Sequence, residues 1–396
     1  MGLQTTSFSK HKATSTAIQF SSVAISPIHV KPSREGRSKI KRKLFTIQEE
    51  TLASSEESSP SKSQLKTDLS PSIQSSILQM TSDSDDQDKK NVESELAAIR
   101  QRKEQEEFHQ SCLANTLRLI ENKPRFYIGM PKESYYLLGI INKHTSIPVE
   151  NILLCLKKIR LDTKLVELAD QFGMSVSNAS KIFSKNVPSI AKALHCFIIK
   201  SNKQAIEQNL PMAFRHKYRN INCIIDCLEI EIQKPLNSLN QALTWSNYKK
   251  ANTIKYLISS TPDGIINYIS PGYGGRITDV CLVENCEFLD NLEPGAIVLA
   301  DRGFKHIEQL LLQRGFSLVR PPSASAKCRL TKLEARKTKQ IASLRIHIER
   351  VIRRLREFSM LKPHSVVNTN SVKFLDDCVI IACALINLQD SLIRNI

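Results

Sequence analysis

The chain has 396 residues, a hydrophobic content of 41% and a formal net charge of +17. This length is enough for two or three domains, and the apolar fraction is enough for hydrophobic cores. No apolar run reaches the roughly 18–20 residues that a membrane-spanning helix needs, and the N-terminus lacks an apolar signal core, so we expect no membrane association.

The positive charge is unevenly distributed. Residues 1–100 hold 14 Lys/Arg against 12 Asp/Glu, a difference of +2, so +15 of the total falls on residues 101–396. Residues 327–356 alone hold 11 Lys/Arg against 2 Glu. Clustered charge of this kind is typical of a polyanion binder, although a solvated basic face is the simpler alternative.

The ten cysteines indicate a reduced compartment. They contain no Cys-x-x-Cys pair, and several lie inside apolar runs. We interpret them as small buried hydrophobic side chains, because neither a disulfide framework nor a zinc site has this spacing.

Residues 1–90 are predicted to form a disordered, basic and serine-rich tail. They include 20 serines and little apolar periodicity, so they cannot bury enough surface to fold. The basic run 31–43 is typical of a nuclear-import signal or of an arm that contacts phosphates, and it predicts a nuclear location. Residues 91–121 predict a helical segment with a short apolar stripe. The stripe spans too few heptads to establish a coiled coil.

Residues 122–205 predict an all-α helix-turn-helix domain. An amphipathic helix runs from Val149 to Ile159, Asp162 is a candidate cap for a second helix, Gly173 ends that helix, and Ser175 caps a third. Two short helices joined by a tight turn that contains glycine are the layout of helix-turn-helix proteins.

The third of these helices supplies the candidate DNA contacts. Its polar side chains suit base edges and phosphates: Ser177, Asn178, Lys181 and Lys185. The alternative is trihelical packing without any role in DNA binding.

Residues 215–392 predict an α/β domain. Strands are expected at 223–232, 253–258, 264–270 and 316–319, and one further strand ends at Asp301. Helices are expected near Asp279 and at 306–314, and a long helix follows the last strand. This order predicts a mixed sheet with helices on both faces.

Three carboxylates in this region are the candidate site. Asp226 interrupts one apolar run, Asp301 ends another, and Glu349 lies in a basic helix with Arg345 and Arg353 at i−4 and i+4. A carboxylate in a half-buried strand loses solvation unless a cation, proton or hydrogen bond compensates it. A shared site for Mg²⁺ or Mn²⁺ would provide that compensation, and it implies a phosphodiester substrate. For Glu349 alone, two intrahelical ion pairs are the competing explanation.

Five ordered motifs extend this pattern. They are Ile224–Glu229, Leu243–Lys250, Gly274–Asp279, Val298–Phe304 and Arg345–Ile352. Together they resemble the DDE transposases of the Harbinger-like superfamily, in the branch that often carries a THAP-type zinc finger. Leu165–Phe183 resembles the helix-turn-helix that precedes that nuclease domain.

The resemblance implies an RNase H-like fold and a catalytic triad of Asp226, Asp301 and Glu349. It also implies that two Mg²⁺ or Mn²⁺ ions bind this triad, with Asp279 as a supporting acidic position. The resemblance places basic side chains around the DNA phosphates, for which the candidates are Arg302, Arg345, Arg350 and Arg353. It allows an accessory DNA-binding protein and a homo-oligomer as partners.

The sequence departs from the family pattern at three points. It contains no Cys/Cys/Cys/His finger, Leu228 stands where a Thr is expected, and Tyr273 stands where a Trp is usual. The sequence therefore predicts a transposon-derived, metal-dependent DNA endonuclease. A DNA-binding or adaptor protein that keeps the scaffold without turnover is the alternative. A hydrolase of small molecules fits poorly with the +15 charge.

Overall fold

The computed structural model describes residues 71–322 and 331–391. The described chain divides into two compact units, of which one ends at Phe108 and the other begins at His109. The predicted tail, its basic run and the nuclear-import signal lie mostly in residues 1–70, outside the described residues. Within the described residues no helix is long and apolar enough to cross a membrane.

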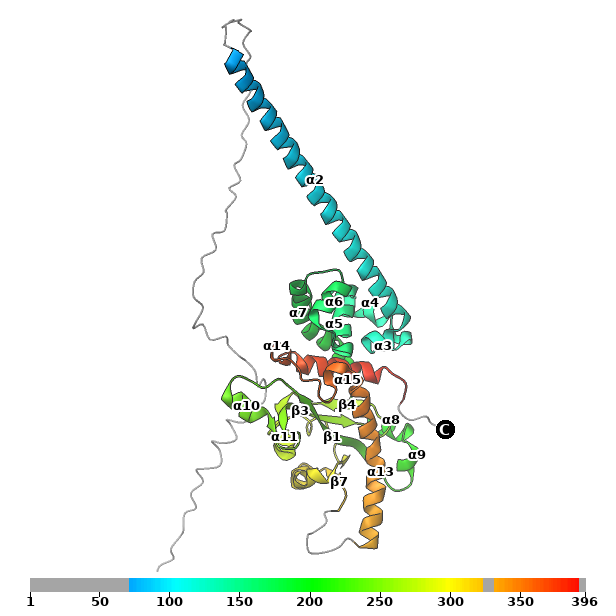
Figure 1. The fold of residues 1–396 in the computed structure, drawn as a ribbon. Helices are drawn as coiled ribbons and strands as arrows, with labels where there is room; N and C mark the ends of the chain where they lie inside the picture. Colours follow the sequence, from blue (N-terminus) through cyan, green and yellow to red (C-terminus); the bar gives the residue numbers. More distant parts are fainter. Residues whose placement is uncertain (1–70, 323–330, 392–396) are drawn as a thin grey trace, which may run out of the picture. The chain divides into compact units, whose positions relative to one another are not determined.

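The first element is the long helix α2 (Pro71–Asn122), which belongs to both units (Figure 1). It begins inside the segment that the sequence predicts to be disordered and contains the whole predicted helical segment 91–121. Its residues from Lys90 to Phe108 are exposed on every side. Its last turns pack through Leu113, Leu117 and Ile120.

A set of helices follows α2 and forms a layer beside the sheet. These are α3 (Pro124–Ile128), η1 (Lys132–Ser134), α4 (Leu137–Thr145), α5 (Val149–Leu161), α6 (Leu165–Gln171), α7 (Val176–Leu194) and η2 (His195–Phe197). Helix α5 is the centre of this layer, because every residue from Ile152 to Arg160 is buried. Helices α5, α6 and α7 occupy the positions that the sequence predicts.

The turns between these helices follow from single residues. Ser175 caps α7 as expected, since its hydroxyl accepts a hydrogen bond from the Asn178 backbone N–H at 3.3 Å. Gly173 has a φ of +61°, and a Cβ there would collide with the His109 carbonyl. The prediction for Asp162 was wrong: it ends α5 in the left-handed conformation, at a φ of 52°, and Lys164 is the N-cap residue of α6. Its carboxylate accepts from Lys158 one turn back, which holds it at the end of α5.

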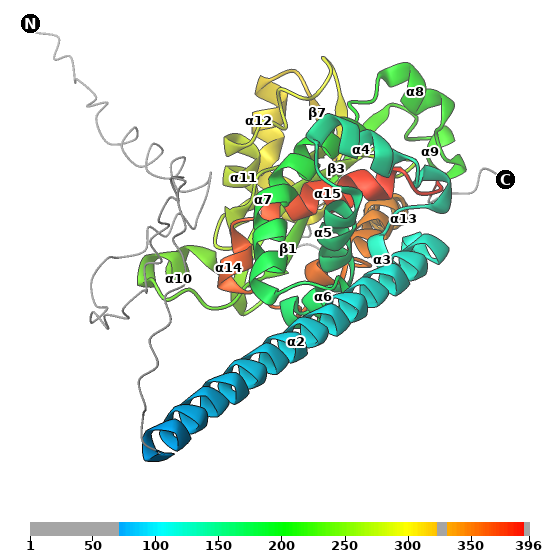
Figure 2. The ribbon, with the colours of Figure 1, turned by 90° about the horizontal axis from the view of Figure 1, so that it is seen from above.

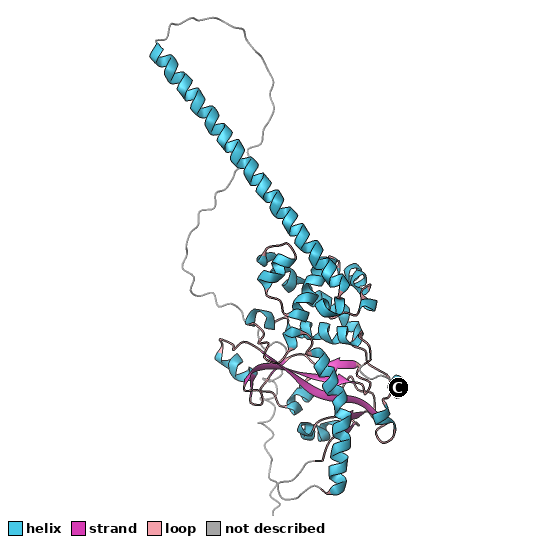
Figure 3. Ribbon diagram, turned by 45° about the vertical axis from the view of Figure 1, so that its right-hand side comes forward, coloured by secondary structure: helices cyan, strands magenta, loops and turns pink. Residues whose placement is uncertain are grey.

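The predicted mixed sheet is present (Figure 3). Two short helices, α8 (Lys203–Gln208) and α9 (Met212–Arg215), lead into β1 (Ile221–Glu231). The other strands are β2 (Trp245–Ser246), β3 (Ala251–Ser260), β4 (Ile266–Ile269), β5 (Tyr273–Gly274), β6 (Ile297–Leu299) and β7 (Ser317–Val319). The order is β2-β3-β1-β6-β7, with β4 and β5 also paired to β3. Strand β1 is antiparallel to β3 and parallel to β6, and β6 is parallel to β7.

Helices cover both faces of this sheet. One face packs on α13 (Lys332–Leu355) and α15 (Leu375–Asn387), and the other packs on α11 (Asp279–Asn285), η3 (Arg302–Ile307) and α12 (Glu308–Gln313). The remaining elements are α10 (Ser238–Thr244), η4 (Ser359–Leu361) and α14 (Thr369–Val372). The side chains of β1 alternate between the two cores: Ile224 and Leu228 face α13, whereas Cys223 and Ile225 face the α11 side.

Helix α15 joins the sheet to the helical layer. It contacts α7, α5, α13 and β4, and it lies between the layer and the sheet (Figure 1); seen from above, it overlaps α5 and α7 (Figure 2). Most of its residues are buried, because it touches neighbours on nearly every side. Arg160 adds a second link, since it pairs with Glu357 at 3.2 Å and stacks on Phe358. The predicted helix-turn-helix and α/β segments therefore share one continuous core.

Candidate active site

Two neighbouring parallel strands bring Asp226 and Asp301 to one face of the sheet. Ile224 of β1 is the register partner of Leu299 of β6, and each aspartate follows two residues later. Because side chains alternate along a strand, both aspartates take the face of Ile224 and Leu299, which is the face that α13 covers. The two carboxylates thus reach the same place from positions far apart in the chain.

The long helix α13 places Glu349 and Arg345 over that face. Its apolar stripe is buried as the sequence predicts, through Ile341, Leu344, Ile348, Val351, Ile352, Leu355 and the following Phe358. Glu349 lies beside this stripe and is exposed, with Arg345 one turn before it. The side chain of Arg345 is only 15% exposed and points to the sheet.

All three predicted catalytic carboxylates meet at the Arg345 guanidinium. Its terminal nitrogens lie 3.0 Å from Asp301 Oδ1, 3.7 Å from Asp226 Oδ2 and 3.8 Å from Glu349 Oε1. Its Nε is buried and has no hydrogen-bond partner among the described residues. The guanidinium therefore contacts the carboxylates through its two terminal nitrogens. The sequence predicted that Arg345 contacts DNA phosphate, whereas here it is the shared cation of an acidic cluster.

The cluster keeps an excess of negative charge. Three carboxylates against one guanidinium leave a formal charge of −2. Burial raises the pKa of Asp226, and the nearby charges of Asp301 and Glu349 raise it further, while the Cys227 backbone N–H and Arg345 act in the opposite direction. The Cys227 N–H donates to Asp226 Oδ1 at 2.8 Å, which fixes the orientation of this carboxylate.

The donor chemistry fits a hard divalent cation. Mg²⁺ and Mn²⁺ bind carboxylate oxygens and keep several positions for water or phosphate, and the uncompensated negative charge of the cluster favours such a cation. However, in the described residues no group of three or more His, Cys, Asp or Glu side chains is arranged around a common ion position. The reason is local: the carboxylates converge on Arg345 instead of on a point between them.

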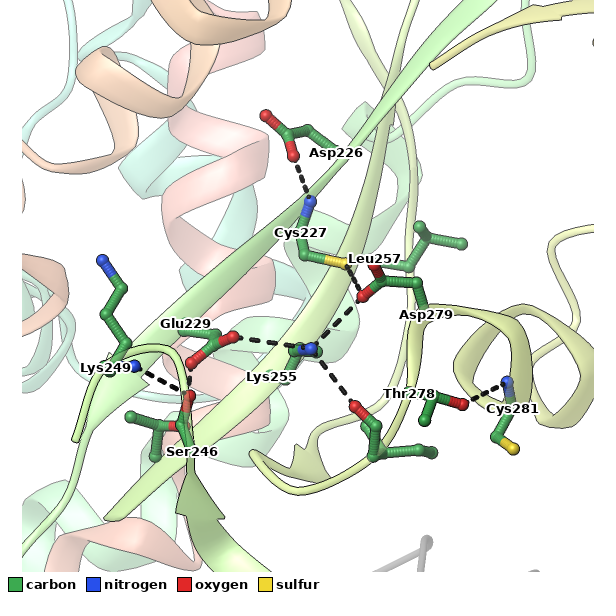
Figure 4. Close-up of polar contacts among 12 residues, drawn as sticks. Asp226, Cys227, Glu229, Ser246, Lys249, Lys255, Leu257, Thr278, Asp279 and Cys281 are labelled. Carbon is green, nitrogen blue, oxygen red and sulfur yellow. Dashed lines mark hydrogen bonds and ion pairs between the residues drawn. The ribbon is translucent and has the colours of Figure 1, made fainter. Parts of the chain in front are cut away.

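Asp279 lies on the other face of β1. Its carboxylate contacts the Cys227 thiol at 3.6 Å and Lys255 Nζ at 3.2 Å, and Lys255 also pairs with Glu229 at 3.5 Å. Figure 4 shows Asp226 turned away from these contacts. The alternation of β1 explains the separation, because Cys227 and Glu229 face the side opposite to Asp226. The structure thus places Asp279 apart from the three carboxylates that surround Arg345.

The network behind the site was missed by sequence reasoning. Glu229 and Lys255 are direct register partners on β1 and β3, and Lys255 is 9% exposed. Burial acts to lower the pKa of the Lys255 ammonium group, but the nearby charges, Asp279 foremost and Glu229 among them, raise the pKa overall, so Lys255 stays charged. The signal was available: Lys255 interrupts the apolar run of β3 as Asp226 interrupts that of β1.

The candidate DNA contacts outside the cluster are all at the surface. Ser177, Asn178, Lys181 and Lys185 are exposed on the first half of α7. Arg350 and Arg353 are exposed on α13, in the turns next to Glu349. Exposure leaves these side chains accessible to a ligand.

One comparison with known proteins finds a similarity in the sheet region. Residues 225–387 match the family model described as DDE superfamily endonuclease, a stretch that includes Asp226, Asp301, Asp279 and Glu349. No curated protein and no solved structure matches the chain. The sheet region is therefore similar to DDE superfamily endonuclease domains, over less than half of the chain.

Proposed function

We propose that residues 215–392 form an RNase H-like endonuclease, derived from a transposon of the Harbinger-like type, that cleaves and joins DNA strands. The observation that supports it is the meeting of Asp226, Asp301 and Glu349 around one guanidinium, from two adjacent strands and a helix. Carboxylates this far apart in sequence have no structural need to share one cation. A common function in binding cations at a scissile phosphate explains their placement.

The three carboxylates would hold Mg²⁺ or Mn²⁺ in a two-metal site, which would activate water or a 3′-hydroxyl and stabilise the leaving oxygen. Arg345 keeps the carboxylates together while the site is free of metal, because its charge offsets their mutual repulsion. For the carboxylates to face an ion, the Arg345 side chain must swing out of the cluster. Its charge would then be available to a phosphate oxygen, which is the role that the sequence suggests.

The rest of the chain contributes DNA binding in this proposal. Helix α7 would contact bases and phosphates through Ser177, Asn178, Lys181 and Lys185, as the second helix of a helix-turn-helix. Arg350 and Arg353 would hold the backbone next to Glu349. Asp279 would have a supporting role through Lys255, and a nuclear location, an accessory DNA-binding protein and a homo-oligomer complete the proposal.

A plasmid-nicking assay tests this function. With Mg²⁺ or Mn²⁺, the full chain should nick supercoiled DNA, and Asp226→Asn, Asp301→Asn and Glu349→Gln should each lower the rate roughly a hundredfold or more, since metal stabilisation contributes several kcal/mol to the barrier. Asp290→Asn is the matched control, because it removes the same charge from an exposed carboxylate that is paired with Arg314 instead. Equal nicking by all four variants would refute the catalytic assignment.

One observation favours a second function, a DNA-binding protein without turnover. Arg345 already neutralises part of the acidic cluster, and no group of carboxylates in the described chain is arranged to hold an ion. This alternative predicts salt-sensitive DNA binding by the parent and by Asp226→Asn alike, with no nicking in either metal. Metal-dependent nicking by the parent excludes it.

A further inference from the structure

Helix α2 exposes an apolar stripe that the described chain leaves uncovered. Val92, Leu96 and Ile99 are 56%, 48% and 59% exposed. They are spaced by four and then three residues, so they lie on one side of the helix. The rest of this segment is polar, and an isolated helix of this kind gains little stability in water without a packed face.

The apolar stripe stops at Ile99, and apolar residues return in the same heptad register only near the end of α2. With Leu96 at position a and Ile99 at position d, the next a and d positions are Lys103, Glu106 and Gln110, followed by Leu113, Leu117 and Ile120. The last three pack on the helical layer, and Ile120 is fully buried. The exposed stripe therefore shares the register of the packed end of α2, but three polar positions separate the two.

The charges beside the stripe identify a suitable occupant. In this register Glu95 and Arg102 are at g positions, and Arg100 and Glu107 are at e positions. In a parallel, in-register pair of helices each g residue faces the e residue five positions later in the partner. A second copy of α2 would thus place Glu95 opposite the partner's Arg100, and Arg102 opposite the partner's Glu107.

We infer that α2 mediates homodimerisation of this chain as a short parallel coiled coil over residues 92–107. All four flanking charges are exposed, and within the described residues none of them forms an ion pair, so they are free to pair between copies. Lys103 at an a position favours two strands over larger bundles, at some cost in stability. The dimer is weak, because only three apolar residues per copy enter the seam and Lys103 and Glu106 also occupy seam positions.

Sedimentation of the full chain over a concentration series tests the dimer. We expect a monomer–dimer equilibrium that Leu96→Asp abolishes. Leu119→Asp is the matched control, because Leu119 is 50% exposed on the same helix but lies at a c position, off the seam. A monomer at all concentrations, or a dimer that Leu96→Asp leaves intact, overturns the inference.

Charge exchange then tests the parallel arrangement. Glu95→Lys alone and Arg100→Glu alone should each weaken the homodimer about tenfold, since both symmetric pairs become repulsive. A mixture of the two variants should restore the affinity. In the heterodimer the two introduced side chains, which have opposite charges, face each other, and the unchanged Glu95 of one copy faces the unchanged Arg100 of the other.

Residues five positions apart, such as Glu95 and Arg100, do not contact each other within one helix. The charge-exchange experiment therefore reports only on pairing between two copies. Failure of the mixture to associate rules out the parallel pairing. Helicity measured by circular dichroism verifies that each variant keeps α2.

Discussion

At the scale of single residues, Arg345 decides the state of the acidic cluster. It is the one cation that contacts Asp226, Asp301 and Glu349 in the described chain, and its side chain is 15% exposed. Sequence reasoning identified the three carboxylates because each occupies an unusual local context. It could not determine where the Arg345 side chain points. A residue four positions before Glu349 on the same helix can turn its side chain toward Glu349 or toward the sheet.

Replacement of Arg345 separates its structural role from its role in DNA binding. Arg345→Met should destabilise the metal-free protein by about 1 kcal/mol, since it leaves three neighbouring carboxylates without their shared cation. It should also enlarge the stabilisation produced by Mg²⁺, because the ion then becomes the cluster's compensating charge. Thermal unfolding with and without Mg²⁺ measures both effects.

Arg353→Met is the control for that experiment. Arg353 is exposed one turn after Glu349 and forms no ion pair in the described chain, so its loss should change the unfolding temperature little. If Arg353→Met destabilises the protein as much as Arg345→Met does, the loss of stability comes from removing any positive charge from α13 and not from the acidic cluster.

A half-buried carboxylate, Asp377, gives a pH prediction. Burial, with a contribution from Asp376, raises the pKa of Asp377 from 3.8 to about 6. The folded state therefore keeps a proton that the unfolded state loses, and the stability from this group falls as the pH rises from about 4 to about 6. Asp377→Asn mimics the protonated side chain, so it should stabilise the protein at pH 7 by about 1 kcal/mol and have no such effect at pH 4.

The difference in unfolding free energy between Asp377→Asn and the parent, measured across this pH range, isolates the effect. This comparison is needed because His347 makes the unfolding free energy change with pH in the opposite direction. Burial lowers the pKa of His347 to about 4, so its contribution to stability is lost as the pH falls from 6.5 to 4. A constant difference between variant and parent would contradict the assignment to Asp377.

At the scale of elements, helix periodicity predicted α5, α7 and α13 well. Their apolar residues recur at helical spacing, and Ser175 and Gly173 supply local start and stop signals. Helix α15 was missed, because its apolar residues occupy most of its circumference and give no periodic contrast. Asp162 was misassigned because a cap residue between two helices can serve either of them.

Helix α7 gives a prediction at this scale. Lys181→Gln with Lys185→Gln should weaken DNA binding and reduce the slope of log K against log salt by about 2, one for each phosphate that the lysines no longer neutralise. Fluorescence anisotropy at several salt concentrations measures the slope. Lys203→Gln with Lys217→Gln removes the same charge from exposed positions on α8 and after α9, and it should leave the slope nearly unchanged.

At the scale of the whole molecule, one core joins the helical layer, the sheet and α13. An ion that binds the folded cluster should therefore stabilise the entire unit from His109 onward, by an amount that grows with its concentration. We expect Mg²⁺ to raise the unfolding temperature of the parent and of Asp290→Asn, but not of Asp226→Asn or Glu349→Gln. Equal shifts in all four proteins would indicate binding elsewhere.

The sequence by itself determined which residues break the apolar pattern and on which strand face each one lies, because side-chain alternation is a local property of the backbone. It also determined the short apolar stripe of α2. Only the tertiary structure decided that β1 and β6 are parallel neighbours, that Arg345 lies among three carboxylates, and that Asp279 pairs with Lys255 behind them. These contacts depend on strand register and helix docking, which are set by the packing of distant segments and have no local signal.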